Sequence, residues 1–127
     1  MDWRARADEA LQRSTILALS TVEEDGGSWT CAVQFQHDGD LVLSFLSMST
    51  TRHAANIERD PRVSAAIWSE PGPPGGNLGL QLRGTAHRVG RAGSGWQQFV
   101  VQPEEVWCFD SRVDRERHAV DVPGRSR

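Results

Sequence analysis

LVLSFLSMSTTRHAANIERDPRV, residues 41–63, changes its pattern halfway along its length. Its first part alternates, so that Leu41, Leu43 and Phe45 share one face as they would on a strand. Small polar or flexible residues follow at 47–51, and the helical pattern after them must end before Pro61, because proline pushes the preceding residue out of helical geometry. The stretch therefore predicts a strand, a turn rich in hydroxyl groups, and a helix.

The turn before this helix has the features of an anion site. Ser49 or Thr50 is expected to cap the helix, and the free N–H groups of its first turn, beside Arg52 and His53, would suit a group of phosphate size. The simpler interpretation is an ordinary capped helix. Because an arginine in the first turn opposes the helix dipole, a bound anion is the better explanation for Arg52.

The composition restricts the class of function. A chain of 127 residues suits one domain with a single core but is small for an elaborate cofactor cavity, so a site shared between two subunits is expected. The net charge is −3 without a basic block, which argues against nucleic acid as a partner. All 14 basic residues are arginine, so a lysine Schiff base is excluded, whereas bidentate binding of phosphate or carboxylate is favoured.

Targeting and metal-binding signals are absent from the sequence. The N-terminus lacks the apolar core of a signal peptide and no run is long enough to span a bilayer, so we expect a cytoplasmic protein without membrane contact. Cys31 and Cys108 lie far apart in strand-like runs and are expected to be reduced core residues. No metal motif, Ser/His/Asp arrangement or paired-carboxylate spacing occurs.

The other segments predict a small antiparallel barrel. An amphipathic helix is expected within residues 1–13, and residues 96–101 and 104–109 predict either a bent pair of strands or one broken strand. Gly84 is expected at a bulge or a close backbone approach. Alternating or β-branched runs predict strands at 14–22, 29–36, 62–69 and 78–89.

Three segments have specific expectations. Residues 29–36, WTCAVQFQ, would place Trp29 in the core together with Cys31, Val33 and Phe35, while the opposite face suits solvent or a flat polar ligand. The Pro/Gly loop at 70–77 is expected to be mobile, to pack against a neighbour, or to act as a lid. The charged tail, 111–127, would either fray or reach a partner, with His118 exposed to solvent.

Four segments in order, ILALSTVEEDGG, WTCAVQFQHDGDLVLSFLS, STTRHAANIERDPRVSAAIW and GLQLRGTAHRV, resemble the flavin-binding split β-barrel proteins related to pyridoxamine 5'-phosphate oxidase. They cover most of residues 16–89. The resemblance implies a single, mainly β domain over 1–127: a six- to seven-stranded antiparallel split β-barrel with Greek-key character, an N-terminal helix and one helix after the third strand. It also implies a homodimer with FMN in a groove between the subunits.

The same resemblance implies which residues contact the cofactor. The flavin ring would lie along the second strand, at Thr30, Cys31, Ala32, Val33 and Gln34. The phosphate would be held at Leu46, Ser47, Thr51, Arg52 and His53.

The C-terminal segment departs from the oxidase pattern. PEEVWCFDSRVDRERH resembles the oxidase element PxxVEFW…RLHDR, with Phe109 in place of tryptophan and Arg115 kept, but with Arg117 and Ala119 at the last two positions. His53 also stands where lysine is common. These differences predict that the chain is not a true pyridoxamine 5'-phosphate oxidase.

Three functions remain open at this stage. The first is an FMN-dependent oxidoreductase acting on an unknown small molecule, in which the flavin supplies the hydride chemistry. The second is a non-catalytic flavin- or haem-binding protein of the same fold. The third is a deazaflavin-dependent reductase, which this acidic, lysine-free chain disfavours because that coenzyme has a long acidic tail. Trp68, Trp96 and Trp107 would be core or interface residues, or one would stack on a ligand.

Overall fold

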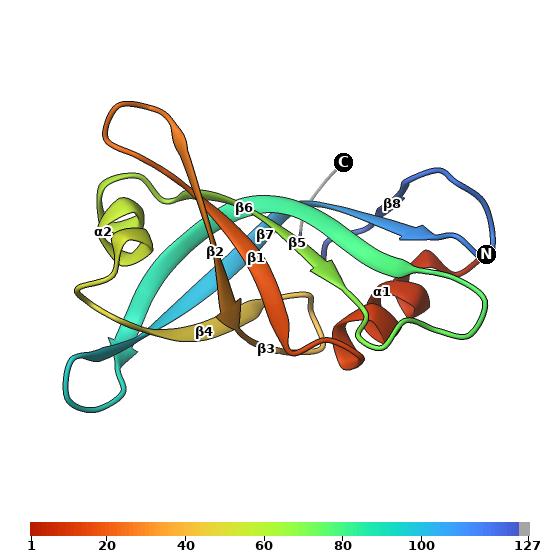
Figure 1. Cartoon of the computed structure of the whole chain (residues 1–127), viewed down its shortest axis with the longest axis horizontal. Coiled ribbons are helices and arrows are strands. Elements are labelled where there is room, and N and C mark those ends of the chain that lie inside the picture. The colour runs from red at the N-terminus through yellow and green to blue at the C-terminus, as the bar shows by residue number, and fades with distance from the viewer. Residues whose placement is uncertain (125–127) are drawn as a thin grey trace.

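The computed structural model describes residues 1–124, and the last three residues of the predicted tail lie outside this part. Two helices, α1 (Trp3–Gln12) and α2 (Arg52–Arg59), accompany one antiparallel sheet (Figure 1). Its strands are β1 (Ile16–Val22), β2 (Ser28–Gln34), β3 (Gln36–His37), β4 (Leu43–Met48), β5 (Arg62–Trp68), β6 (Leu78–Arg91), β7 (Trp96–Asp110) and β8 (His118–Val120).

The strand order is β2-β1-β5-β6-β7-β4-β3, and β8 adds to β7. A mainly β, antiparallel fold is thus confirmed, with eight strands where six to seven were expected. The excess comes from β3 and β8, which have only two and three residues and are too short to leave a periodic pattern. Within residues 1–124 the hydrogen-bonded ladder ends at β2 and β3 and does not close.

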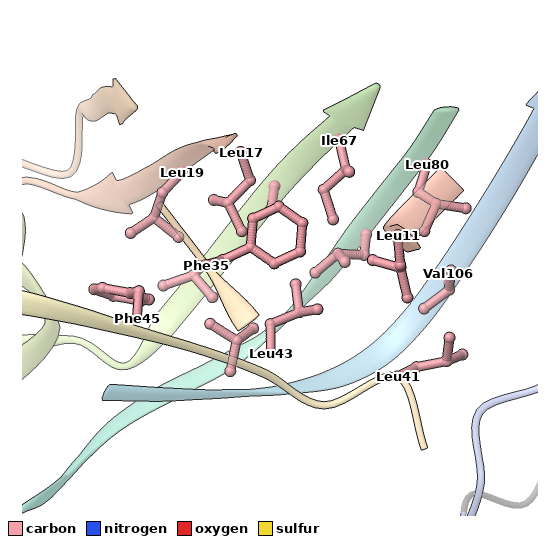
Figure 2. Packing of buried hydrophobic residues seen from close by; sticks show 14 of the residues in the cluster. Leu11, Leu17, Leu19, Phe35, Leu41, Leu43, Phe45, Ile67, Leu80 and Val106 are labelled. Carbon is pink, nitrogen blue, oxygen red and sulfur yellow. The ribbon is translucent and has the colours of Figure 1, made fainter. Parts of the chain in front are cut away.

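The core lies on the concave side of this curled sheet. Alternate residues of the strands point into it, among them Leu17 and Leu19 of β1, and Leu11 of α1 joins them (Figure 2). Phe45 of β4 stacks on Phe99 of β7, with ring centroids 5.2 Å apart. The alternating patterns predicted from the sequence therefore reflect one shared apolar interior.

Gly84 marks the bend of the longest hairpin. The β6–β7 register shifts between Arg83 and Gly84, which confirms the predicted irregularity. A Cβ atom on Gly84 would lie 2.0 Å from the carbonyl oxygen of Gln102. Pro103 pairs with Gly84 at this point, so β7 continues through the proline as one strand rather than a pair. A bulge tolerates a proline because the ladder is interrupted there.

The start of α2 differs from the prediction. Thr51, not Ser49 or Thr50, is the N-cap, and its hydroxyl accepts from the Ala54 amide at 3.3 Å. Ser49 is still engaged with the neighbouring hairpin, because its amide donates to the Gly95 carbonyl at 3.1 Å. The chain therefore needs two further residues before it can turn into the helix. The helix ends at Arg59, with Asp60 as the C-cap before Pro61.

Trp29 is not a core residue. It shares its side of β2 with Val33, but its side chain is 37% exposed, because the β1–β2 hairpin extends past the core. Cys31 is half-buried and Cys108 is buried, and both are free thiols. The core residues predicted from the alternation are thus confirmed for the inner part of β2 and wrong for its outer end.

The C-terminal segment packs on its own chain over the described residues. Strand β8 pairs with β7, and His118 stacks on Trp3 with centroids 3.9 Å apart, so His118 is not simply solvated. Its Nε2 also lies 2.9 Å from the Asp114 carboxylate. Residues 70–77 form no strand. No helix within residues 1–124 is long and apolar enough to cross a bilayer.

Asp110 joins the N-terminal helix to the end of β7. Its carboxylate is fully buried and accepts from Arg6 of α1 and, at 2.7 and 2.9 Å, from the Arg112 guanidinium. Hydrogen bonds from Arg112 lower the pKa of Asp110 to about 2. Its stabilising contribution is therefore present above pH ~4 and is lost as the pH falls towards 2.

Asp110→Asn should lower the free energy of unfolding by about 2 kcal/mol at pH 7, because charge-assisted hydrogen bonds are lost in a buried place. Urea unfolding followed by far-UV circular dichroism measures this. Asp40→Asn, at an exposed turn position, serves as the control and should change little. Equal stability of the two variants would show that Asp110 does not anchor α1.

Gly84→Ala should destabilise the protein by about 3 kcal/mol or prevent folding, because the added methyl group would overlap the Gln102 backbone. Gly90→Ala, in the same strand but with no atom within 4 Å of the new Cβ, is the matched control and should leave the melting temperature nearly unchanged. Similar melting temperatures would refute the close approach.

Candidate functional site

A groove of about 1070 Å³ opens beside β2 and β4 and is large enough for a cofactor-sized ligand. Its walls come from four parts of the chain: Thr15 just before β1, the β2–β3 region, β4 with the start of α2, and the turn end of the β6–β7 hairpin. The lining residues are Thr15, Ala32, Val33, Gln34, Phe35, Gln36, Ser44, Phe45, Leu46, Ser47, Met48, Thr51, His53, Ala92, Trp96 and Gln98.

One end of the groove carries a cluster of hydroxyl and imidazole groups. Ser47 Oγ lies 2.6 Å from His53 Nε2, and Thr51 Oγ1 lies 3.4 Å from the same nitrogen. Strand β4 supplies Ser47 and the first turn of α2 supplies His53, so the strand-to-helix turn brings them together. Burial lowers the pKa of His53, and its neutral form is therefore favoured at neutral pH.

The rest of the groove wall mixes amide and apolar groups. Ala32 and Gln34 are exposed along β2, and Trp96, beside the end of β4 that carries Ser47, is 45% exposed. Trp96 pairs with Met48 and Gln98 pairs with Leu46 across the β4–β7 ladder. This wall offers a planar ring an aromatic face and hydrogen-bonding groups at its edges.

Arg52 does not line the groove, although its neighbours Thr51 and His53 do. Its guanidinium donates to the Glu23 carboxylate and lies 3.8 Å from the centre of the Trp29 ring. A first-turn arginine was expected to indicate a bound anion, and in this structure the Glu23 carboxylate occupies that role. Hydrogen bonding from Arg52 in turn lowers the pKa of Glu23.

The structure gathers seven of the residues that the family resemblance indicated. Around the groove lie Ala32, Val33, Gln34, Leu46, Ser47, Thr51 and His53. Thr30 instead shares a hydrogen bond of 2.8 Å with Ser20. Cys31 is half-buried and absent from the groove wall. Phe109 lies at the end of β7 opposite to Trp96, and Arg115 lies in the segment between β7 and β8.

Several lining residues were not identified from the sequence as ligand contacts. The sequence indicates Trp96 only as one of three tryptophans that could stack on a ligand, and it carries no ligand signal at Met48, Ala92 or Gln98. They reach the groove through the pairing of β4 with β7, which are distant in the sequence. The alternating pattern of 96–101 indicated a strand but not its neighbour.

The lining residues restrict the chemistry of this site. None of them is a carboxylate or an arginine, and His53 is the one with a side chain that titrates near neutral pH. Such a groove can bind and orient a ligand, but the part of its wall formed by residues 1–124 contains no acid–base pair. Any redox chemistry here would come from the bound molecule.

A possible cation site lies elsewhere. Asp114, Glu116 and His118 bring three ligand atoms within 4.8 Å of one another, but His118 is already paired with Asp114. Within residues 1–124 this cluster lies outside the groove.

The sequence matches the protein-family model described as "Pyridoxamine 5'-phosphate oxidase" over residues 4–122. Among curated proteins, none matches the sequence. The fold is also found in solved structures of low sequence identity, which are similar in architecture alone.

Three such structures are informative. General Stress Protein 26 from Bacillus anthracis str. Sterne is 15% identical, with 94% of this chain and 100% of that chain covered and a TM-score of 0.76. A heme binding protein from Mycobacterium smegmatis is 16% identical, with 92% of this chain and 56% of that chain covered and a TM-score of 0.75. A putative pyridoxamine 5'-phosphate oxidase from Listeria innocua is 18% identical, with 84% of this chain and 97% of that chain covered and a TM-score of 0.68.

The free energy of unfolding of the protein should depend on pH through His53. Its folded-state pKa lies below the ordinary value of 6.5, so the unfolded chain binds the proton more readily and stability falls as the pH drops below that value. His53→Gln should remove this contribution, and the urea midpoint should fall less between pH 7.5 and 5.5 than in the wild type. His87→Gln, at an exposed position of β6, is the control. A parallel fall in all three proteins would contradict the assignment.

Proposed function

This chain belongs to the pyridoxamine 5'-phosphate oxidase family, and on that premise we propose that it is an FMN-binding split-barrel protein that acts as a flavin-dependent oxidoreductase on a small molecule. The observation that carries the proposal is the groove itself. It joins a hydroxyl and imidazole cluster of phosphate size to a flat wall that suits a planar ring.

The donor set fits FMN. Ser47, Thr51 and His53 would hold the phosphate, with the N-terminal end of α2 adding a favourable dipole. Ala32, Val33 and Gln34 would align the ring along β2. Bound flavin supplies hydride transfer, and the protein orients the ring and limits its contact with water.

The proposal includes a homodimer. Ala18 pairs with Ala32 on one side and Ala66 on the other, so small side chains form a flat row on the outer face of the sheet. Ile16 and Trp68 flank this row and are 42% and 43% exposed. A second copy would cover these apolar groups. It would also provide a place for Phe109 and Arg115, which lie far from the groove of their own chain.

Two alternatives differ in how well they fit the groove. A non-catalytic flavin- or haem-binding protein fits a groove whose wall has no acid–base pair, and one structural relative is described as a heme binding protein. A deazaflavin-dependent reductase is less favoured, because none of the arginines within residues 1–124 lines the groove to accept an acidic tail. The departures in the C-terminal segment also argue against true pyridoxamine 5'-phosphate oxidase activity.

Absorbance from 300 to 600 nm, before and after addition of FMN and then NADPH, is the first test. Flavin bands that shift on binding, bleach with the nicotinamide and recover in air would support the oxidoreductase. Bound flavin that no reductant bleaches would favour the binding protein. If addition of FMN causes no spectral change, the protein does not bind FMN; this result would refute the proposal, and haem would be tested next.

Ser47→Ala should weaken FMN binding by about 1.5 kcal/mol, or roughly tenfold, because a hydrogen bond to a charged phosphate is lost. Riboflavin, which has no phosphate, should bind as it does to the wild type. Ser28→Ala, on β2 but outside the groove, is the matched control. Fluorescence quenching of the flavin gives both dissociation constants, and equal losses for FMN and riboflavin would contradict a phosphate contact.

A further inference from the structure

The Arg52 side chain is held away from the groove by contacts within the protein, with Glu23 and Trp29. Thr51 and His53, on either side of it, both line the groove, whereas the Arg52 guanidinium donates to Glu23 and covers the Trp29 ring. The side chain is 56% exposed. It can therefore change its direction without disturbing the core.

Glu23 is also held in position by a contact that does not involve Arg52. Its second carboxylate oxygen accepts from Asn56 Nδ2 at 2.8 Å. Asn56 is only 3% exposed and also donates to Thr21 at 3.0 Å, while Arg59 donates to the Asn56 amide oxygen at 3.0 Å. The acceptor that retains Arg52 is thus part of the network that attaches α2 to β1.

Among the described residues that line the groove, its phosphate end therefore offers the neutral donors of Ser47, Thr51 and His53 and no arginine. The charge of Arg52, between the two lining residues Thr51 and His53, is neutralised by the Glu23 carboxylate outside the groove. A phosphate group entering the groove would have to compete with Glu23 for Arg52. A ligand without phosphate would meet no such competition.

We propose that Glu23 sets the selectivity of the groove for phosphorylated over unphosphorylated ligands, by keeping Arg52 paired outside it. This inference rests on the proposed function, because it concerns the same groove. It assigns Glu23 as a specificity-determining residue, and it predicts that the wild type discriminates less strongly between FMN and riboflavin than a variant in which Arg52 is released.

Glu23→Gln tests this directly. Glutamine keeps the size of the side chain and an oxygen for Asn56 but removes the charge that retains Arg52. FMN should bind roughly tenfold more tightly to this variant, and riboflavin should bind as to the wild type. The double variant Glu23→Gln/Arg52→Ala should lose the gain.

Glu24→Gln is the matched control, because it removes the same charge from the adjacent exposed position. It should leave the FMN-to-riboflavin ratio unchanged, which separates the local contact from the general rise in net charge. Thermal melting of every variant checks that α2 remains attached. An equal gain in Glu24→Gln, or an unchanged ratio in Glu23→Gln, would overturn the inference.

A titration with inorganic phosphate makes this test independent of the flavin. If no variant binds FMN or riboflavin, the proposed function fails, whereas the inference still requires tighter phosphate binding by Glu23→Gln that Arg52→Ala abolishes. Nuclear magnetic resonance of the Arg52 Nε–H group would show its release from Trp29. Phosphate affinity that is equal or undetectable in all variants would overturn the inference.

Discussion

The antiparallel pairing of β6 with β7 is the constraint on which the rest of the structure depends. β6 also pairs with β5, while β7 also pairs with β4 and β8, so both halves of the sheet are attached to this one hairpin. The bulge at Gly84 increases the local bend and twist of the strands, and the sheet curls around a single core. The carbonyl of Gln102 occupies the space that any other side chain would need.

A second constraint attaches helix α2 to the sheet. Asn56 is buried and connects Thr21 with Glu23, which are both at the end of β1. A buried polar group must keep its partners, since an unpaired one costs about 1–3 kcal/mol. The network therefore orders Glu23 for structural reasons, and the electrostatics of the groove follow from it, because Glu23 also determines where the Arg52 charge lies.

The groove combines residues from parts of the chain that meet only in the folded protein. Ser47 and His53 belong to the strand-to-helix turn, whereas Trp96 comes from the far end of the β6–β7 hairpin. The same architecture occurs in proteins described as a general stress protein and as a heme binding protein. A fold of this kind positions a ligand without specifying it, so the residues on the groove wall carry the argument for function.

The sequence by itself determined the local elements of this protein. Alternation predicted the strands, Pro61 ended the helix, and Gly84 indicated the bulge, because each of these features depends on a few neighbouring residues. The order of motifs also indicated the family and seven of the groove residues. Tertiary structure alone decided that Thr51 is the cap, that Trp29 lies outside the core, that Trp96 faces the groove, and that Arg52 turns to Glu23. Those outcomes depend on which distant segments become neighbours, and no local pattern encodes the pairing of Arg52 with a carboxylate in the loop after β1.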